Sequence, residues 1–153
     1  MTAPLRVVAP VSGTVLAMSG VPDPVFAGEI VGPGLAVDPT RGPGEAISPI
    51  AGTILKLHPH AFVVQAPGSH AVLVHLGLDT VQLGGVGFTL HVAEGDVVQE
   101  GTTVVSWNPL DIEAGGRSPI CPVVALEGTS GALEGLVEPG ATVKAGDPLF
   151  VWS

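Results

Sequence analysis

Two short segments place histidines where their side chains could do chemistry. His58 and His60 stand two residues apart just ahead of an apolar run, and His75 closes the next apolar run, four residues before Asp79. Histidines that open or end neighbouring strands can converge on one point. An imidazole at such a point can transfer a proton, bind a metal ion or carry a phosphoryl group. The spacing therefore predicts a histidine site, with these three kinds of chemistry open.

The elements that must position these histidines are predicted to be strands. The chain has 153 residues, of which 22 are glycine and 15 are proline, and these two types separate short apolar runs. Glycine and proline at such short intervals are typical of an all-β domain with tight turns. Runs rich in Val, Ile and Leu fit strands that are covered on both faces. One helical turn is expected over residues 109–114, where Asn108 can cap the N-terminus. The expected strands are 6–9, 14–18, 28–31, 35–37, 52–57, 61–65, 71–76, 87–92, 103–107, 123–127 and 148–152.

Two parts of the sequence repeat. Segment 10–16 (PVSGTVL) is echoed by segment 49–55 (PIAGTIL), and segments 92–107 and 137–152 share spaced glycines and a final tryptophan. Each copy is predicted to form a strand, a glycine turn and a second strand. Duplicated units of this kind would close into one compact antiparallel β-sandwich or barrel-like domain. We expect a single domain over residues 1–153 that stands alone, because the chain starts at Met1 and ends just past Trp152.

Charge and composition exclude several classes of function. The formal net charge of −9 argues against nucleic acid and an anionic membrane surface as partners, and suits a partner with a basic contact face. No stretch of about 20 residues is apolar without interruption, so we expect no membrane insertion. Residues 1–20 could pass for a weak signal peptide, but Pro10, Ser12 and Gly13 interrupt them, which favours a strand. The single cysteine, Cys121, is expected to be buried and favours a reducing cytoplasm.

Several motifs occur together in a fixed order. The most specific is Val-His-Leu-Gly-Leu-Asp-Thr-Val at 74–81, and the others lie at 21–26, 31–34, 60–62, 84–88 and 118–124. In these motifs the chain resembles the glucose-type IIA domain of the bacterial phosphoenolpyruvate-dependent sugar phosphotransferase system, from about Val8 to Trp152. The resemblance implies a cytoplasmic phosphocarrier that requires no cofactor.

The resemblance also implies roles for individual residues. His75 would take a phosphoryl group on Nε2 from the phosphohistidine of HPr and pass it to a cysteine of a sugar-specific IIB domain. His60 would steady the phosphoryl oxygens, and the Gly77 carbonyl would accept a hydrogen bond from Nδ1–H of the active histidine. Regulatory protein targets are also possible partners in such families. Residues that match the partner-binding surface are the acidic Asp23 and Asp79 and the apolar Phe26, Val31, Phe62 and Val81.

One position departs from the family pattern. The well-known members have threonine where this chain has His58, and there the hydroxyl forms a hydrogen bond within the histidine pair. A histidine at this position could fill the same role, change the pKa values of the pair or add a third nitrogen to the site. The role of His58 is therefore open.

A zinc peptidase is the alternative from a different class. His58-x-His60 and His75-x-x-x-Asp79 are the ligand pairs of LytM-type endopeptidases, and two His with one Asp and water suffice for zinc-dependent hydrolysis. In that family, however, the two pairs occur in the opposite order, and the enzymes act outside the membrane. Zinc binding by His60 and His75 alone stays open as a separate possibility.

A biotinyl-type or lipoyl-type carrier domain is a third interpretation, suggested by the repeated glycine turns. Such carriers need a lysine at an exposed hairpin tip. Lys56 and Lys144 are the only lysines, and neither has the expected Met-Lys neighbourhood. The sequence therefore favours the phosphocarrier.

Overall fold

The fold is an all-β sandwich, as the sequence predicted. The computed structural model describes residues 4–68 and 70–153. Within them, no helix is both long and apolar enough for a membrane crossing. The short helices are η1 (Met18–Gly20), α1 (Pro24–Ala27), η2 (Thr80–Leu83), α2 (Pro109–Ala114) and η3 (Ser130–Ala132). The strands are β1 (Leu5–Val8), β2 (Gly13–Ala17), β3 (Gly34–Pro39), β4 (Gly44–Ile47), β5 (Gly52–His58), β6 (Ala61–Gln65), β7 (Ala71–His75), β8 (Thr89–Leu90), β9 (Val97–Val98), β10 (Thr103–Trp107), β11 (Cys121–Ala125), β12 (Leu133–Gly135), β13 (Thr142–Val143) and β14 (Pro148–Trp152).

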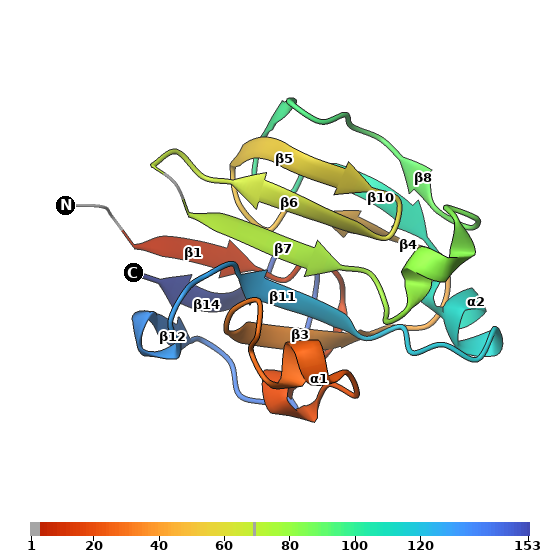
Figure 1. The fold of residues 1–153 in the computed structure, drawn as a ribbon, viewed down its shortest axis with the longest axis horizontal. Coiled ribbons are helices and arrows are strands. Elements are labelled where there is room, and N and C mark those ends of the chain that lie inside the picture. Colours follow the sequence, from red (N-terminus) through yellow and green to blue (C-terminus); the bar gives the residue numbers. More distant parts are fainter. Residues whose placement is uncertain (1–3, 69) are drawn as a thin grey trace.

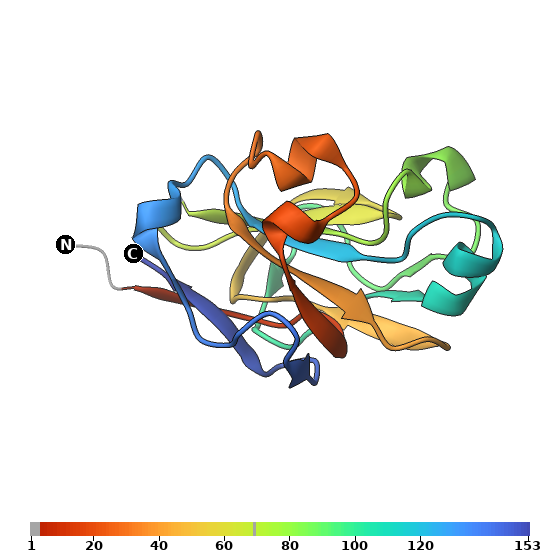
Figure 2. The ribbon, with the colours of Figure 1, turned by 90° about the horizontal axis from the view of Figure 1, so that it is seen from below.

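The strands form two layers around one core. The larger sheet has the order β13-β2-β3-β11-β7-β6-β5-β9, and two smaller sheets have the orders β1-β14-β12 and β4-β10-β8. Figure 1 shows β5, β6, β7, β11 and β3 side by side, and Figure 2 shows β1 and β14 in the layer below them. Helix α1 lies outside the larger sheet, over β3 and β11 (Figures 1 and 2).

Alternation along β6 and β7 decides which side chains face the core. Phe62 and Val64 of β6, and Val72 and Val74 of β7, have no exposed surface and belong to the main core cluster. Full burial of one such side chain stabilises the fold by about 1.5–3 kcal/mol. Because successive residues of a strand point to opposite faces, His75 is directed to the outer face of the sheet.

The predicted internal duplication is confirmed. Gly13 of β2 pairs with Val143 of β13, and Gly52 of β5 pairs with Val98 of β9 in the same antiparallel way. On the other side of each glycine, a Cβ on Gly13 would collide with the carbonyl oxygen of Asp38 in β3, and a Cβ on Gly52 would collide with that of Gln65 in β6. The repeated glycine is therefore required where two strands approach each other closely.

The expected strand at 28–31 is wrong. The Asp23 side chain accepts a hydrogen bond from the Val25 N–H at 2.9 Å, and Pro24 starts α1 immediately after it. The chain then turns, with Glu29 at a φ of 55°. The expected strand at 87–92 shortens to β8, and β4, β9, β12 and β13 were not predicted. By contrast, α2 occupies the predicted residues, and the Asn108 side chain caps it.

Candidate active site

The two histidines of the strongest motifs converge at one edge of the larger sheet. Ala61, the first residue of β6, pairs with His75, the last residue of β7. The Leu76 N–H donates to the carbonyl of His60 at 2.7 Å, which fixes the turn before β6 against the end of β7. The two imidazole centroids lie 5.2 Å apart with an angle of 70° between the ring planes.

A backbone carbonyl fixes the orientation of the His75 ring. Nδ1 of His75 lies 2.5 Å from the carbonyl oxygen of Gly77, so this nitrogen carries the proton and donates it. Gly77 has a φ of +80°, and a Cβ there would lie 2.7 Å from Cγ2 of Thr80 and 3.0 Å from the carbonyl oxygen of Ser118. The hydroxyl of Thr80 is buried and donates to the carbonyl of Leu76 at 2.7 Å. The turn is therefore rigid, and it leaves Nε2 of His75 with a free lone pair.

The surroundings keep both imidazoles neutral at pH 7. Burial lowers the pKa of His75, and the Gly77 carbonyl and the charges of Asp23 and Asp79 oppose this effect. Burial also lowers the pKa of His60, and the neighbouring His75 and then His58 lower it further. A neutral ring with a free Nε2 is the form in which a histidine acts as a nucleophile.

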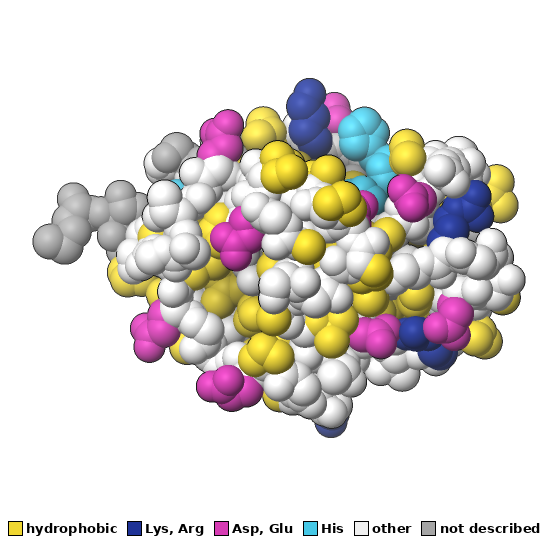
Figure 3. Space-filling view, turned by 60° about the horizontal axis from the view of Figure 1, so that its bottom comes forward, with side chains coloured by type: hydrophobic (Ala, Val, Ile, Leu, Met, Phe, Trp, Pro, Cys, Tyr) yellow, Lys and Arg dark blue, Asp and Glu magenta, His cyan; other side chains and the backbone are white. Residues whose placement is uncertain are grey.

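His58 adds a third imidazole to the same edge. It ends β5, is exposed, and its ring stacks on that of His60 with centroids 5.7 Å apart and 25° between the planes. Figure 3 shows histidine side chains clustered on one rim of the surface, next to acidic and hydrophobic side chains. The structure thus brings all three histidines of the motifs together.

The acidic and aromatic residues next to the histidines come from two segments. Asp23 caps α1, and Phe26 of α1 is buried with its ring centroid 5.3 Å from that of His75. Asp79 is exposed, has a φ of 58° and precedes η2. Val81, in η2, is 62% exposed. These two segments therefore border the histidines.

Three of the four predicted apolar contact residues are not exposed as expected, and one of them is Phe26, which is 8% exposed. Phe62 is fully buried, because it takes an inward position of β6 and packs in the main core. Its predicted place in a partner-contact ring is therefore wrong. Val31 is only partly exposed and packs against a smaller apolar cluster, which includes Phe26 and Leu78. Three further apolar side chains on the same two segments are 41–76% exposed and were not predicted as contact residues, although a proline or glycines nearby were an available signal: Val25, Ile30 and Val86.

The ligand set of the peptidase alternative is not assembled. Among residues 4–68 and 70–153, no group of three or more His, Cys, Asp or Glu side chains could hold a metal ion. His58, His60, His75 and Asp79 therefore do not form the zinc centre that a LytM-type mechanism needs.

The remaining histidines and the cysteine lie outside the cluster. His70 stacks on Trp152 with centroids 3.9 Å apart, and Nε2 of His91 lies 2.6 Å from the Ser106 hydroxyl. Cys121 is fully buried, and burial raises the pKa of its thiol to about 12. Cys121 is thus a packing residue, as expected.

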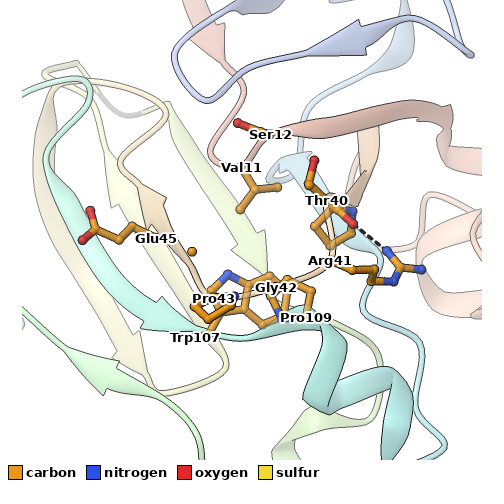
Figure 4. Close-up of a pocket in the computed structure, with 11 residues that line it drawn as sticks. Val11, Ser12, Thr40, Arg41, Gly42, Pro43, Glu45, Trp107 and Pro109 are labelled. Carbon is orange, nitrogen blue, oxygen red and sulfur yellow. Dashed lines mark hydrogen bonds between the residues drawn. The ribbon is translucent and has the colours of Figure 1, made fainter.

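A separate cavity lies beneath the loop between β3 and β4. It has a volume of about 260 Å³ and is lined by Ser12, Thr40, Glu45 and Trp107, among others (Figure 4). Arg41 also lines the cavity, and its guanidinium donates to the carboxylates of Asp38 and Glu113 at 2.7 and 2.8 Å and to the carbonyl of Pro39. No histidine lines this cavity, so it is separate from the histidine cluster.

Comparison with known proteins supports the same chemistry. Residues 5–130 match the family model described as phosphoenolpyruvate-dependent sugar phosphotransferase system, EIIA 1. A protein of Oceanobacillus iheyensis named PTS system glucose-specific EIIA component is 42% identical over 120 residues, which cover 78% of this chain and 73% of that protein. A protein of Bacillus cereus with the same name is 41% identical over 118 residues, which cover 77% of this chain and 72% of that protein.

A solved structure has the same fold over almost the whole chain. Glucose permease IIA from Mycoplasma capricolum is similar with a TM-score of 0.87 and 31% sequence identity. The match covers 98% of this chain and 96% of that one. The fold and the sequence matches therefore point to the same family.

Proposed function

Because the chain belongs to the EIIA 1 family of the phosphoenolpyruvate-dependent sugar phosphotransferase system, we propose that His75 is the residue through which it acts as a phosphocarrier. The chain is a phosphotransferase component that carries a phosphoryl group between proteins. The contact between Nδ1 of His75 and the Gly77 carbonyl supports this assignment most directly. It fixes the tautomer in which the Nε2 lone pair is free to attack phosphorus.

Phosphoryl uptake then proceeds in one exchange. Nε2 of His75 forms a bond to phosphorus while the bond between phosphorus and the donor nitrogen breaks, and the donor ring keeps that electron pair. The proton stays on Nδ1 throughout, and Nδ1–H keeps donating its hydrogen bond to the Gly77 carbonyl. Onward transfer reverses the roles, because His75 keeps the electron pair of its own N–P bond as an acceptor sulfur attacks phosphorus.

His60 and Phe26 support this exchange in different ways. An N–H of the His60 ring, 5.2 Å from the ring of His75, can donate to the oxygens of a phosphoryl group on Nε2. The ring of Phe26 covers another side of His75 and excludes water, which protects the phosphohistidine from hydrolysis. No cofactor is needed, since side chains supply both the nucleophile and the donor.

The surface around His75 suits a basic protein partner. We assign HPr as the donor and a cysteine of a sugar-specific IIB domain as the acceptor, in the cytoplasm, with residues 1–153 acting as one domain. Asp23 and Asp79 would face arginines of HPr, and each exposed pair is worth roughly 0–1 kcal/mol. Their combined field raises the rate of association more than the affinity, which suits a carrier. The exposed apolar side chains of the two segments that border the histidines are Val25, Ile30, Val81 and Val86.

Intact mass spectrometry tests the assignment. The wild type, His75→Gln and the control His91→Gln are incubated with phosphoenolpyruvate, enzyme I and HPr. We expect the wild type and His91→Gln to gain one acid-labile phosphoryl group and His75→Gln to gain none, although it folds normally. A full phosphoryl gain by His75→Gln would place the acceptor elsewhere, and no gain by the wild type beside active HPr would overturn the carrier mechanism.

A further inference from the structure

A bulge in β5 brings His58 to the face of the sheet that carries His75. Pairing of β5 with β6 runs from Thr53 and Ile54 to Lys56, Leu57 and His58, with a register shift between Ile54 and Lys56. Ile54 points into the core and is 1% exposed. The extra residue of the bulge reverses the alternation, so that Leu57 packs against the core and His58 points outward.

The turn after His58 is held from several sides. Pro59 fixes its own φ and restricts His58 to extended backbone. The turn that follows η2 packs on Pro59, since a Cβ on Gly85 would lie 3.3 Å from Cγ of Pro59. The carbonyl of His60 accepts from the Leu76 N–H. The backbone of all three turn residues is therefore fixed.

The side chain of His60, by contrast, is held only by its ring neighbours. In the part of the chain that the structure describes, neither nitrogen of the His60 ring has a hydrogen-bond partner, although the His75 ring nitrogen has one. Its ring lies between the edge-on ring of His75 at 5.2 Å and the nearly parallel ring of His58 at 5.7 Å. Offset stacking at such a distance favours one orientation of a ring over others.

We propose that His58 is a positioning residue, which stacks on His60 and keeps that ring edge-on to the phosphoryl group on His75. This inference rests on the proposed function, because His60 is the residue that contacts the phosphoryl group. His58 acts through His60 and makes no direct contact with the phosphoryl group. The β5 bulge is the backbone device that makes this stacking possible.

The test measures onward transfer in a single turnover. Phosphorylated wild type, His58→Ala, His58→Phe and the control His91→Ala are mixed with increasing concentrations of a IIB domain. We expect His58→Ala to lower the saturating rate about three- to tenfold, which corresponds to the loss of one ring–ring contact. The IIB concentration that gives half the maximal rate should not change. His58→Phe keeps a planar ring and should restore the rate, and His91→Ala should match the wild type.

A double variant shows whether His58 acts through His60. In the His60→Gln background the stacking partner is absent, so the added His58→Ala change should have no effect on the rate. The same slowing in both backgrounds, or a wild-type rate in His58→Ala, would overturn the inference and leave the carrier role of His75 intact. A wild type that takes up no phosphoryl group would instead overturn the proposed function and this inference together.

Discussion

Substitution of Gly77 tests the turn that orients His75. Gly77→Ala places a side chain at a φ of +80°, which costs about 1–2 kcal/mol for an L-residue. The new Cβ would also lie 2.7 Å from Thr80 and 3.0 Å from the Ser118 carbonyl. The hydrogen bond from the Thr80 hydroxyl to the Leu76 carbonyl keeps the Thr80 side chain from moving away from this Cβ. Such overpacking typically costs about 1–3 kcal/mol. We expect a total loss of about 3 kcal/mol of the free energy of unfolding.

Gly84→Ala is the matched control for this substitution. Gly84 has a φ of +60°, but a Cβ there would meet no atom within 4 Å. Only the strain of the left-handed backbone applies at Gly84, so we expect the free energy of unfolding to fall by about 1 kcal/mol. Urea unfolding followed by fluorescence measures both variants, because Trp107 and Trp152 are buried and report on the core. The difference between the two variants isolates the steric collision beneath His75.

The same two variants separate stability from chemistry. Gly77→Ala should also slow phosphoryl uptake, because the displaced carbonyl no longer holds Nδ1 of His75 and the tautomer with a free Nε2 loses its preference. Gly84→Ala should take up the phosphoryl group at the wild-type rate. Equal losses of stability in the two variants, or normal uptake by Gly77→Ala, would refute the reasoning about this turn.

Three further outcomes are expected. NMR titration of His75 should show a midpoint below pH 6.5, because burial lowers its pKa. Asp23→Asn should move the midpoint further down, since the Asp23 charge favours the protonated ring. A midpoint above pH 6.5 in the wild type would contradict this assignment. His60→Gln should accept a phosphoryl group from HPr but transfer it onward about a hundredfold more slowly, as for loss of one preorganised donor, whereas normal onward transfer would remove His60 from the mechanism. Cys121 should resist iodoacetamide in the native protein and react once urea unfolds it, because the buried thiol has a pKa of about 12; rapid native labelling would show that the site is open.

Local patterns in the sequence predicted much of the fold. The echo of 10–16 in 49–55 predicted the duplication, because a glycine that must admit a neighbouring strand is required in both copies. The error at 28–31 arose from reading an apolar run as a strand. Asp23 and Pro24 are a cap and a first helical residue, and this local signal favours α1.

Only those parts of the site could be predicted that depend on the residue motifs and on the ends of adjacent strands. The resemblance suggested a pairing of His60 with His75, and their convergence follows from the ends of adjacent strands. The contact role expected for Phe62 is wrong, because this residue takes an inward position of β6 and its side chain is buried in the core. The outward direction of His58 could not be read from the sequence, since it depends on a register shift that only the pairing with β6 defines.

The duplication has a consequence for how such a carrier could change over time. The two copies of the repeated strand continue differently. β5 leads directly into Pro59 and His60, which belong to the reactive group, whereas β2 leads through η1 into α1, which supplies Asp23 and Phe26. The copy that contains β5 thus leads into the histidines themselves, whereas the copy that contains β2 leads into a charge and a ring that surround His75. Substitutions in the first half of the chain can therefore act on His75 through the charge of Asp23 or the ring of Phe26 while the three histidines stay unchanged.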